Sequence, residues 1–318
     1  MTRVLILDPV HPDGPARLAE AGFDVDHLPD PAEADMLARM PEADALILRG
    51  RHLSDAVWSA GGRLRLVSRH GVGCDNVDFG RMARMGVTVA ISADANYVSV
   101  AEHAMALMLA AAKRLPEGAR AAAGEWDRRN AMGARDVHGA SLLVVGFGRI
   151  GRALAERARA FGARVTAYDP ALPDDAPLPE GVARAHDLPA AMGEAEIVSL
   201  HLPATPETRN LLDAALLGRL PAGAILVNTA RGGIVDEAAL LGHLERDGTA
   251  FYATDVLAAE PPRPDDPLLA HPRVIVSPHS AAMTAQGARR MSAGAAENVA
   301  AFFDGTLDPR MVVFRPDA

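Results

Sequence analysis

The feature that most constrains the fold is an apolar run that leads directly into a Gly-x-Gly-x-x-Gly motif. The run covers residues 142–145, and the three glycines are Gly146, Gly148 and Gly151. A segment with helical spacing follows the last glycine. A buried strand, a tight glycine turn and a helix N-terminus in this order are typical of a dinucleotide-binding unit.

Each glycine of the motif has a separate part in such a unit. Gly146 allows the turn, Gly148 lets the backbone approach a pyrophosphate, and Gly151 lets the helix pack against the strand. The first N–H groups of the helix, near Arg149 and Ile150, have no partner within the helix and are expected to point at the phosphate. The helix dipole favours negative charge there.

A second β-rich run ends in Asp169, which lies 18 residues after Gly151. A carboxylate at this place can accept hydrogen bonds from both ribose hydroxyls of adenosine, and it would repel a 2′-phosphate. The alternative is that Asp169 only opens the turn that continues with Pro170. With the glycines in register, the sequence predicts NAD as the cofactor, preferred over NADP.

The length of 318 residues predicts two domains. The first part alternates short apolar runs with helix-period segments, which indicates a parallel sheet covered by helices. Asp8 follows its first strand, where a dinucleotide site would carry glycines, so we expect a smaller α/β domain of the flavodoxin type without the cofactor. Its expected strands are residues 4–7, 23–25, 45–48, 66–68 and 87–90.

The second part predicts a doubly wound Rossmann sheet of six strands. These are residues 142–145, 164–168, 197–200, 224–227, 250–254 and 274–276. One long helix, from residue 98 to about 123, is expected to join the domains, with Ser99 and Glu102 forming a capping box. A final helix and tail are expected to return to the first domain. The predicted domains are residues 1–97 with 285–318, and residues 98–284.

Several functional classes are excluded by composition. The net charge of −9 and the absence of a Lys/Arg run argue against nucleic-acid binding. A single cysteine, Cys74, excludes an intrachain disulfide and a cysteine-based zinc site, and we expect no metal. The strand pattern begins at residue 4, so we expect no signal peptide. The most apolar helix carries Glu102 and His103 and is too short to cross a bilayer. We expect a cytoplasmic protein.

Polar residues follow the carboxyl ends of the expected strands, which is where ligands bind in a doubly wound sheet. Hydride transfer at a hydroxyl-bearing carbon needs an acid/base, a cation for the substrate and an oriented cofactor. His279 is the natural acid/base, and Glu260, in a proline-rich loop, would hold its tautomer. Arg231 supplies a charged fork suited to a carboxylate. The alternatives are a simple turn, a solvated loop carboxylate and a surface arginine.

These motifs together resemble the D-isomer-specific 2-hydroxyacid dehydrogenase family along essentially the whole chain. The resemblance places the family's catalytic arginine, glutamate and histidine on Arg231, Glu260 and His279. The matching stretches are residues 68–78, 100–103, 145–151, 228–237, 255–257, 260–261 and 277–279.

The same resemblance implies further contacts. Backbone N–H groups of Val72 and Gly73 would hold the substrate carboxylate, and Asp255 would bind the nicotinamide carboxamide. The long junction helix would form a homodimer. The residues implied to line the cofactor cleft are His201, Pro203, Thr229 and Ala230.

Residues 124–133 resemble the phosphoglycerate dehydrogenase branch of the family. Many members of that branch carry C-terminal regulatory domains, and because the chain ends at Ala318 we expect none here. The resemblance implies that formate dehydrogenases of the same fold pair the histidine with a glutamine. Glu260 is a glutamate and therefore argues against that activity.

The substrate loop departs from the family pattern at His70, where relatives are often aromatic or small. Cationic residues also follow strands of the first domain, which predicts a substrate with a polar or anionic tail, such as hydroxypyruvate or phosphoglycerate. They are Arg49, Arg51, His52 and Arg69. The alternative is that these are ordinary surface arginines. Cys74, in the same loop, is expected to be a small packed residue.

The sequence therefore predicts an NAD-dependent oxidoreductase that interconverts a D-2-hydroxy acid and its 2-oxo acid, such as hydroxypyruvate, glyoxylate or the 3-phosphoglycerate type. The alternative is an NADH-sensing binding module of the same fold, in which the dinucleotide shifts assembly and does not react.

Overall fold

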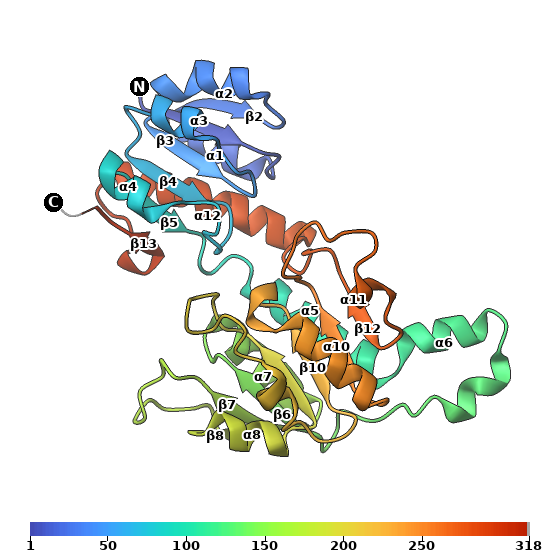
Figure 1. Cartoon of the computed structure of the whole chain (residues 1–318). Helices are drawn as coiled ribbons and strands as arrows, with labels where there is room; N and C mark the ends of the chain where they lie inside the picture. The colour runs from blue at the N-terminus through green and yellow to red at the C-terminus, as the bar shows by residue number, and fades with distance from the viewer. Residues whose placement is uncertain (317–318) are drawn as a thin grey trace. The chain divides into compact units, whose positions relative to one another are not determined.

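The computed structural model describes residues 1–316 and divides into two compact units (Figure 1). Unit 1 holds residues 1–97 together with the chain from residue 282 onward, and unit 2 is the continuous segment Val98–Ala281. The return to unit 1 thus comes at residue 282, where the sequence predicted residue 285. Each unit is built around one sheet.

The sheet of unit 1 has six strands in the order β13-β5-β4-β3-β1-β2. The first five strands of the chain are parallel in the flavodoxin-like order 2-1-3-4-5. The sixth comes from the tail and pairs antiparallel with β5 at the edge. The strands are β1 (Arg3–Leu7), β2 (Asp24–Leu28), β3 (Ala45–Leu48), β4 (Leu66–Arg69), β5 (Thr88–Ile91) and β13 (Val312–Phe314).

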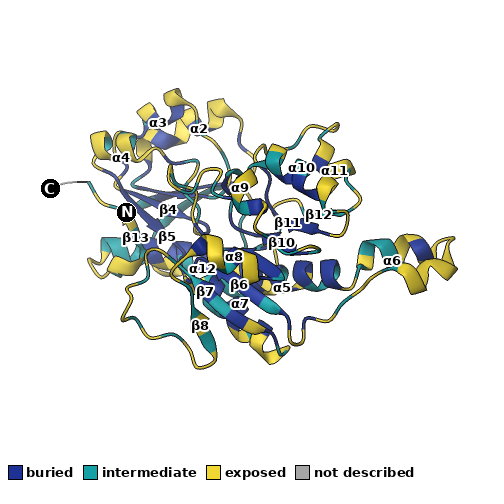
Figure 2. Ribbon diagram, turned by 60° about the horizontal axis from the view of Figure 1, so that its bottom comes forward, coloured by how far each residue is buried: buried dark blue, intermediate teal, exposed yellow. Residues whose placement is uncertain are grey.

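Helices cover both faces of this sheet, because successive residues of a strand point to opposite sides. Along β1, Leu5 and Leu7 join one core cluster, while Val4 and Ile6 join another that includes Ala295 of α12. Figure 2 shows the buried strands and the exposed outer faces of the helices. The helices are α1 (Asp13–Glu20), α2 (Glu33–Arg39), α3 (Asp55–Ala60), α4 (Phe79–Met85) and α12 (Ala285–Phe303), with 3₁₀ turns η1 (Met40–Glu42) and η4 (Pro309–Met311).

The sheet of unit 2 has seven parallel strands in the order β12-β11-β10-β9-β6-β7-β8. Counted from β6 this is the Rossmann order 3-2-1-4-5-6 with one further strand, which confirms the predicted fold class. The strands are β6 (Ser141–Val145), β7 (Arg164–Tyr168), β8 (Val182–Arg184), β9 (Ile197–Leu200), β10 (Ile225–Asn228), β11 (Phe251–Thr254) and β12 (Val274–Val276).

The expected count of six strands was wrong, because β8 was missed. This strand has three residues, none of them buried, and it lies at the edge of the sheet after a proline-rich loop. A strand so short and exposed has no apolar run to indicate it.

The helices of unit 2 include the predicted junction helix, which was wrong in length because it is broken into α5 and α6. Arg114 between them has a φ of 55°, and Pro116 stands in the first turn of α6. A proline inside one continuous helix would lack an N–H and clash with the carbonyl of Ala112, four residues earlier. The helices are α5 (Tyr97–Ala112), α6 (Leu115–Ala122), α7 (Arg149–Ala160), α8 (Leu188–Glu194), α9 (Ala214–Leu217), α10 (Glu237–Arg246) and α11 (Pro267–Ala270), with 3₁₀ turns η2 (Trp126–Ala131) and η3 (Gly232–Ile234).

The predicted capping box was also wrong. Helix α5 begins at Tyr97, so Ser99 lies inside the first turn and is buried. Glu102 instead pairs with Arg157 of α7 at 3.3 Å. Within residues 1–316, no helix combines the length and apolar character needed to cross a membrane.

Candidate active site

The glycine turn lies between β6 and α7. Gly146 has a φ of 93°, and a Cβ there would stand 2.7 Å from the backbone carbonyl of His201. A Cβ on Gly151 would lie 2.2 Å from the Gly146 carbonyl oxygen, so the helix packs directly on the turn. Gly148, by contrast, faces open space and begins α7 without a side-chain cap. Gly146 and Gly151 thus leave no room for a side chain, whereas the space at Gly148 is open.

Asp169 follows β7 and ties the second strand to this turn. One carboxylate oxygen accepts from the Phe147 N–H at 2.7 Å, and the other accepts from the Ala171 N–H at 2.9 Å. The second contact is the turn geometry expected of an Asp-Pro sequence. Each carboxylate oxygen has two lone pairs, so these bonds leave acceptor capacity for ribose hydroxyls.

Two buried polar atoms lack hydrogen-bond partners within residues 1–316 at this edge of the sheet. One is Nδ1 of His201, after β9, and the other is Oγ1 of Thr229, after β10. Burial lowers the pKa of His201 to about 3, so its ring is neutral near pH 7, and Nε2 is hydrogen-bonded to Ser199 Oγ at 2.9 Å. Unpaired buried polar atoms at this edge of the sheet fit a polar ligand such as a dinucleotide.

His279 and Glu260 form the central pair of the site. Nδ1 of His279 lies 2.6 Å from one oxygen of Glu260, and the other oxygen accepts from the Leu257 N–H at 3.0 Å. The carboxylate is therefore held by backbone on one side and by the imidazole on the other. The His279 side chain remains 52 % exposed, so Nε2 is available to a substrate.

Arg231 is half-buried after β10, where Asn228 Nδ2 donates to its carbonyl oxygen at 2.9 Å. A Cβ on Gly232 would lie 2.0 Å from the carbonyl carbon of Leu257, so the two loops touch through their backbones. The loop that bears Glu260 is held further by Glu237, whose carboxylate accepts from the Ala258 N–H at 2.7 Å. Burial raises the pKa of Glu237. The segments that carry Arg231 and Glu260 are thus packed together.

Asp255, after β11, is 1 % exposed and accepts three hydrogen bonds from one turn. They come from Ser277 Oγ at 2.6 Å and from the N–H groups of Ser280 and Ala281 at 2.9 Å each. Ser277 in turn contacts His103 of α5 at 2.7 Å. Sequence reasoning did not connect His103 with the site. The available signal was an imidazole in a mostly apolar helix.

The predicted substrate loop follows β4 in unit 1. His70 is 6 % exposed, and burial, followed by the charge of Arg49, lowers its pKa to about 4, so it is neutral near pH 7. Val72 is 37 % exposed and Gly73 is half-buried. Because these residues belong to the other unit, their part in substrate binding stays a prediction.

The cationic residues predicted to face the substrate mostly contact other groups of unit 1. Arg51 pairs with Asp8 at 2.9 Å and with Asp30 at 3.1 Å. Arg69 is buried and donates to the carbonyl oxygens of its own neighbourhood, including Gly73 at 2.8 Å. Arg49 donates to the Pro9 carbonyl oxygen and to the Met283 sulfur, both at 2.9 Å, and has no carboxylate partner within residues 1–316. Arg51 and Arg69 therefore have partners within unit 1, and a part for these cations in substrate binding stays a prediction.

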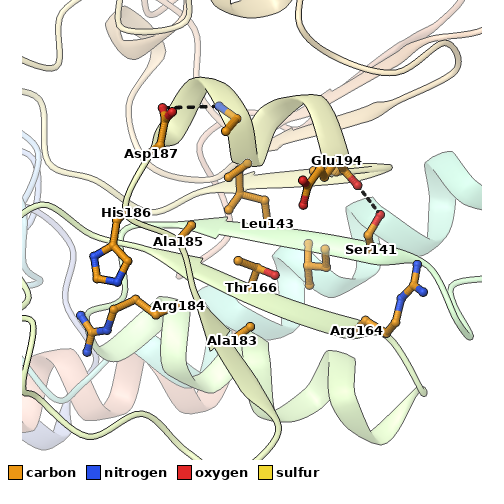
Figure 3. A pocket seen from close by; sticks show the side chains of 14 residues that line it. Ser141, Leu143, Arg164, Thr166, Ala183, Arg184, Ala185, His186, Asp187 and Glu194 are labelled. Carbon is orange, nitrogen blue, oxygen red and sulfur yellow. Dashed lines mark hydrogen bonds between the residues drawn. The ribbon is translucent and has the colours of Figure 1, made fainter.

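A separate groove of about 710 Å³ lies between α8 and strands β6, β7 and β8 (Figure 3). Arg164 stands at one end, and Arg184 and His186 stand at the other. None of the predicted site residues lines it. Among residues 1–316, no group of three or more His, Cys, Asp or Glu side chains could hold a metal ion.

Comparisons with known proteins point to the same family over most of the chain. Residues 105–281 match the family model for the D-isomer specific 2-hydroxyacid dehydrogenase, NAD binding domain. The chain is 35 % identical over 314 residues to a D-3-phosphoglycerate dehydrogenase of Methanocaldococcus jannaschii, covering 98 % of this chain and 59 % of that protein. The chain therefore spans somewhat more than half the length of this relative.

Two solved structures have the same fold. The TT0316 protein of Thermus thermophilus is 33 % identical, with a TM-score of 0.86 over 98 % of this chain and 100 % of that one. An NADPH-dependent glyoxylate/hydroxypyruvate reductase of Sinorhizobium meliloti, in complex with NADP and malonate, is 28 % identical. Its TM-score is 0.83 over 100 % of this chain and 99 % of that one. The chain belongs to the D-isomer-specific 2-hydroxyacid dehydrogenase family.

Proposed function

We propose that the protein is an NAD-dependent oxidoreductase that interconverts a D-2-hydroxy acid and its 2-oxo acid. The observation that carries this proposal is the pair formed by His279 and Glu260 at 2.6 Å, with the carboxylate anchored by the Leu257 N–H. An imidazole held in one tautomer by a fixed carboxylate is suited to move a proton at its other nitrogen.

The glycine turn and Asp169 would hold NADH, which would supply the hydride for C2 of the 2-oxo acid in the reduction. His279 donates Nδ1–H to Glu260 and gives the proton on Nε2 to the developing alkoxide oxygen. The Glu260 carboxylate stabilises the imidazolium before transfer. Arg231 binds the substrate carboxylate and polarises the carbonyl group with its guanidinium. In the oxidation, neutral His279 takes the hydroxyl proton back.

The proposed cofactor is NAD, preferred over NADP. The glycine turn of residues 146–151 would let the pyrophosphate lie close to the N-terminus of α7. Asp169 would accept hydrogen bonds from the ribose hydroxyls. The Sinorhizobium meliloti relative is in complex with NADP, so the fold by itself does not exclude NADP. We expect NADH to bind at least about tenfold more tightly than NADPH, because a carboxylate repels a 2′-phosphate. Equal affinities in a fluorescence titration would contradict the preference.

For the substrate, we propose a small 2-oxo acid with a polar or anionic tail. The names of the two relatives, a phosphoglycerate dehydrogenase and a glyoxylate/hydroxypyruvate reductase, support this class. His70, Val72 and Gly73 are the proposed substrate-loop contacts. Arg49 is the best candidate for the tail, because it has no carboxylate partner within residues 1–316.

The direct test is to follow NADH absorbance with glyoxylate, hydroxypyruvate, pyruvate, phosphohydroxypyruvate, sulfopyruvate and oxaloacetate. We expect rapid oxidation of NADH by at least one of them. His279→Ala should lower kcat by about 10²–10⁴-fold and leave NADH affinity largely unchanged. His186→Ala, at an exposed histidine of the same unit, is the matched control.

The outcomes separate the candidate functions. Unimpaired turnover in His279→Ala would reject the proposed acid/base. Tight NADH binding with no oxidation by any 2-oxo acid would favour the NADH-sensing module. The homodimer and the cytoplasmic location stay predictions, and sedimentation equilibrium of the protein tests the dimer.

A further inference from the structure

Three polar side chains from separate parts of unit 2 meet beneath the turn that carries His279. Ser277 Oγ lies 2.6 Å from Asp255 Oδ1 and 2.7 Å from Nε2 of His103. The same imidazole nitrogen lies 3.5 Å from Asp255 Oδ1. The reaction proposed above makes no use of His103 or Ser277.

The distances fix the direction of these hydrogen bonds. Ser277 has one hydroxyl proton, and its shortest contact is with the Asp255 carboxylate, which can only accept. The hydroxyl oxygen must then accept from His103, so Nε2 of His103 carries a hydrogen. Ser277 is therefore not a nucleophile activated by a histidine. It relays a hydrogen bond from the helix α5 to Asp255.

Asp255 uses its remaining acceptor capacity to shape the turn. Its carboxylate accepts from the N–H groups of Ser280 and Ala281, and its carbonyl oxygen accepts from the His279 N–H at 2.9 Å. His279 has a φ of 50°, which is costly for a residue with a side chain. Such a conformation persists only where its surroundings enforce it, and here the enforcing group is Asp255.

We propose that His103 is a positioning residue for the acid/base. By donating to Ser277, it holds Asp255 in the rotamer that accepts from the N–H groups of Ser280 and Ala281, which fixes the turn and so keeps the His279 imidazole directed at Glu260. His103 is suited to this because its neighbours Ala101 and Ala104 are buried, which fixes α5 in the core. The inference rests on the proposed function, since it concerns the proton transfer assigned there to His279.

The test compares His103→Leu with His103→Gln. Leucine removes the donor, whereas the glutamine amide can place an N–H near the position of Nε2. For His103→Leu we expect kcat with the best 2-oxo acid to fall about tenfold, the loss typical of one hydrogen bond, with KM and NADH affinity within about twofold. His103→Gln should recover most of kcat. His186→Leu, at an exposed histidine of unit 2, is the control and should match the wild type.

A second measurement needs neither cofactor nor turnover. In the cofactor-free protein, amide hydrogen exchange at Ser280 and Ala281 should accelerate about fivefold to tenfold in His103→Leu and stay near the wild-type rate in His103→Gln. Exchange in the strands of unit 2 should not change, which separates loss of the grip from general destabilisation.

Unchanged kcat and unchanged exchange in His103→Leu would overturn the inference. Equal defects in the leucine and glutamine variants, with faster exchange throughout unit 2, would also overturn it, because His103 would then be only a packing residue. If the wild type oxidises no NADH, the proposed function fails. The exchange experiment would still show whether His103 holds the turn.

Discussion

The first strand of each sheet is followed by a similar backbone turn, but the two turns differ in how their N–H groups are paired. The first strand of each, β1 and β6, is followed by a residue with positive φ, which is Asp8 at 82° in unit 1 and Gly146 at 93° in unit 2. The Asp8 carboxylate accepts from the N–H groups of Gly50 and Arg51 at 3.1 Å each, and from the Arg51 guanidinium. After Gly146, the Phe147 N–H donates to the Asp169 carboxylate at 2.7 Å, and a Cβ on Gly148 would meet no atom within 4 Å.

This difference shows how one residue can decide the use of a shared architecture. In unit 1 the protein's own carboxylate meets the donors at the end of the first strand. In unit 2 the Asp169 carboxylate accepts from the Phe147 N–H of the corresponding turn, but the space at Gly148 stays open. A parallel sheet provides a binding edge in both cases, but only the second leaves that edge to a ligand.

The largest loss of cofactor affinity that we expect comes from placing a side chain at Gly146. Gly146→Ala adds a strained φ and a clash with the His201 backbone, and should weaken NADH binding by roughly 100-fold, about 3 kcal/mol. Gly22→Ala is the matched control, because Gly22 has a φ of 83° but no atom within 4 Å of its Cβ position. It should cost only about 1 kcal/mol in unit 1. Wild-type NADH affinity in Gly146→Ala would remove the contrast between the turns.

The second prediction concerns buried His70 in unit 1. Its pKa falls from 6.5 to about 4 on folding, so the unfolded chain takes up the proton first as the pH falls. The stabilisation is complete above pH 6.5 and is lost as the pH falls toward 4, with a total of roughly 3 kcal/mol. In a Trp126→Phe background, urea unfolding followed by the fluorescence of buried Trp58 reports on unit 1. His70→Leu should lose less stability over this range, and an identical loss would contradict the prediction.

The third prediction tests the anion that unit 1 supplies for itself. Asp8→Asn should lower the free energy of unfolding of unit 1 by about 2 kcal/mol, because it removes the charge of the more buried of the two carboxylates that pair with the Arg51 guanidinium. Asp30→Asn, at the other and 95 % exposed partner of Arg51, should cost less than about 0.5 kcal/mol. The same Trp58 fluorescence measures both. Equal costs would mean that Asp8 has no special place at the end of β1.

The smallest effect concerns the substrate tail. Arg49→Gln should reduce the preference for an anionic-tailed 2-oxo acid over pyruvate by about tenfold in kcat/KM, which is about 1.4 kcal/mol. Arg51→Gln should leave that preference unchanged, since its charge is already balanced by Asp8 and Asp30. If the two variants behave alike, the division of cations into structural and functional ones fails.

The sequence predicted both sheets because their strands are apolar runs punctuated by turns, a signal that lies within a few residues. It failed where the signal was short or where a single residue overrode a longer pattern. The three exposed residues of β8 carry no apolar run, and Pro116 breaks a helix that its neighbours would continue.

The candidate residues could be named from the sequence, but their partners could not. The contact between His103 and Ser277 joins residues 174 positions apart, and that between Asp8 and Arg51 joins residues 43 positions apart. No local periodicity indicates such pairs. They follow only from the way the strands lie side by side. For the same reason the sequence could not show that Arg51 has carboxylate partners in unit 1 and Arg49 does not.

The return of the chain to unit 1 has a consequence for the order of folding. Unit 2 is one continuous segment, so all its strands are present once residue 281 has left the ribosome. Unit 1 lacks α12 and β13 until residues 285–314 have been made, and both belong to its fold, since Ser68 donates to the Ala295 carbonyl oxygen and Ala90 pairs with Val312. Domains fold as units during synthesis, and distant contacts form slowly. We therefore expect the Rossmann unit to fold during synthesis. The five parallel strands of unit 1 are made earlier, but one face of their sheet stays uncovered until α12 has been made.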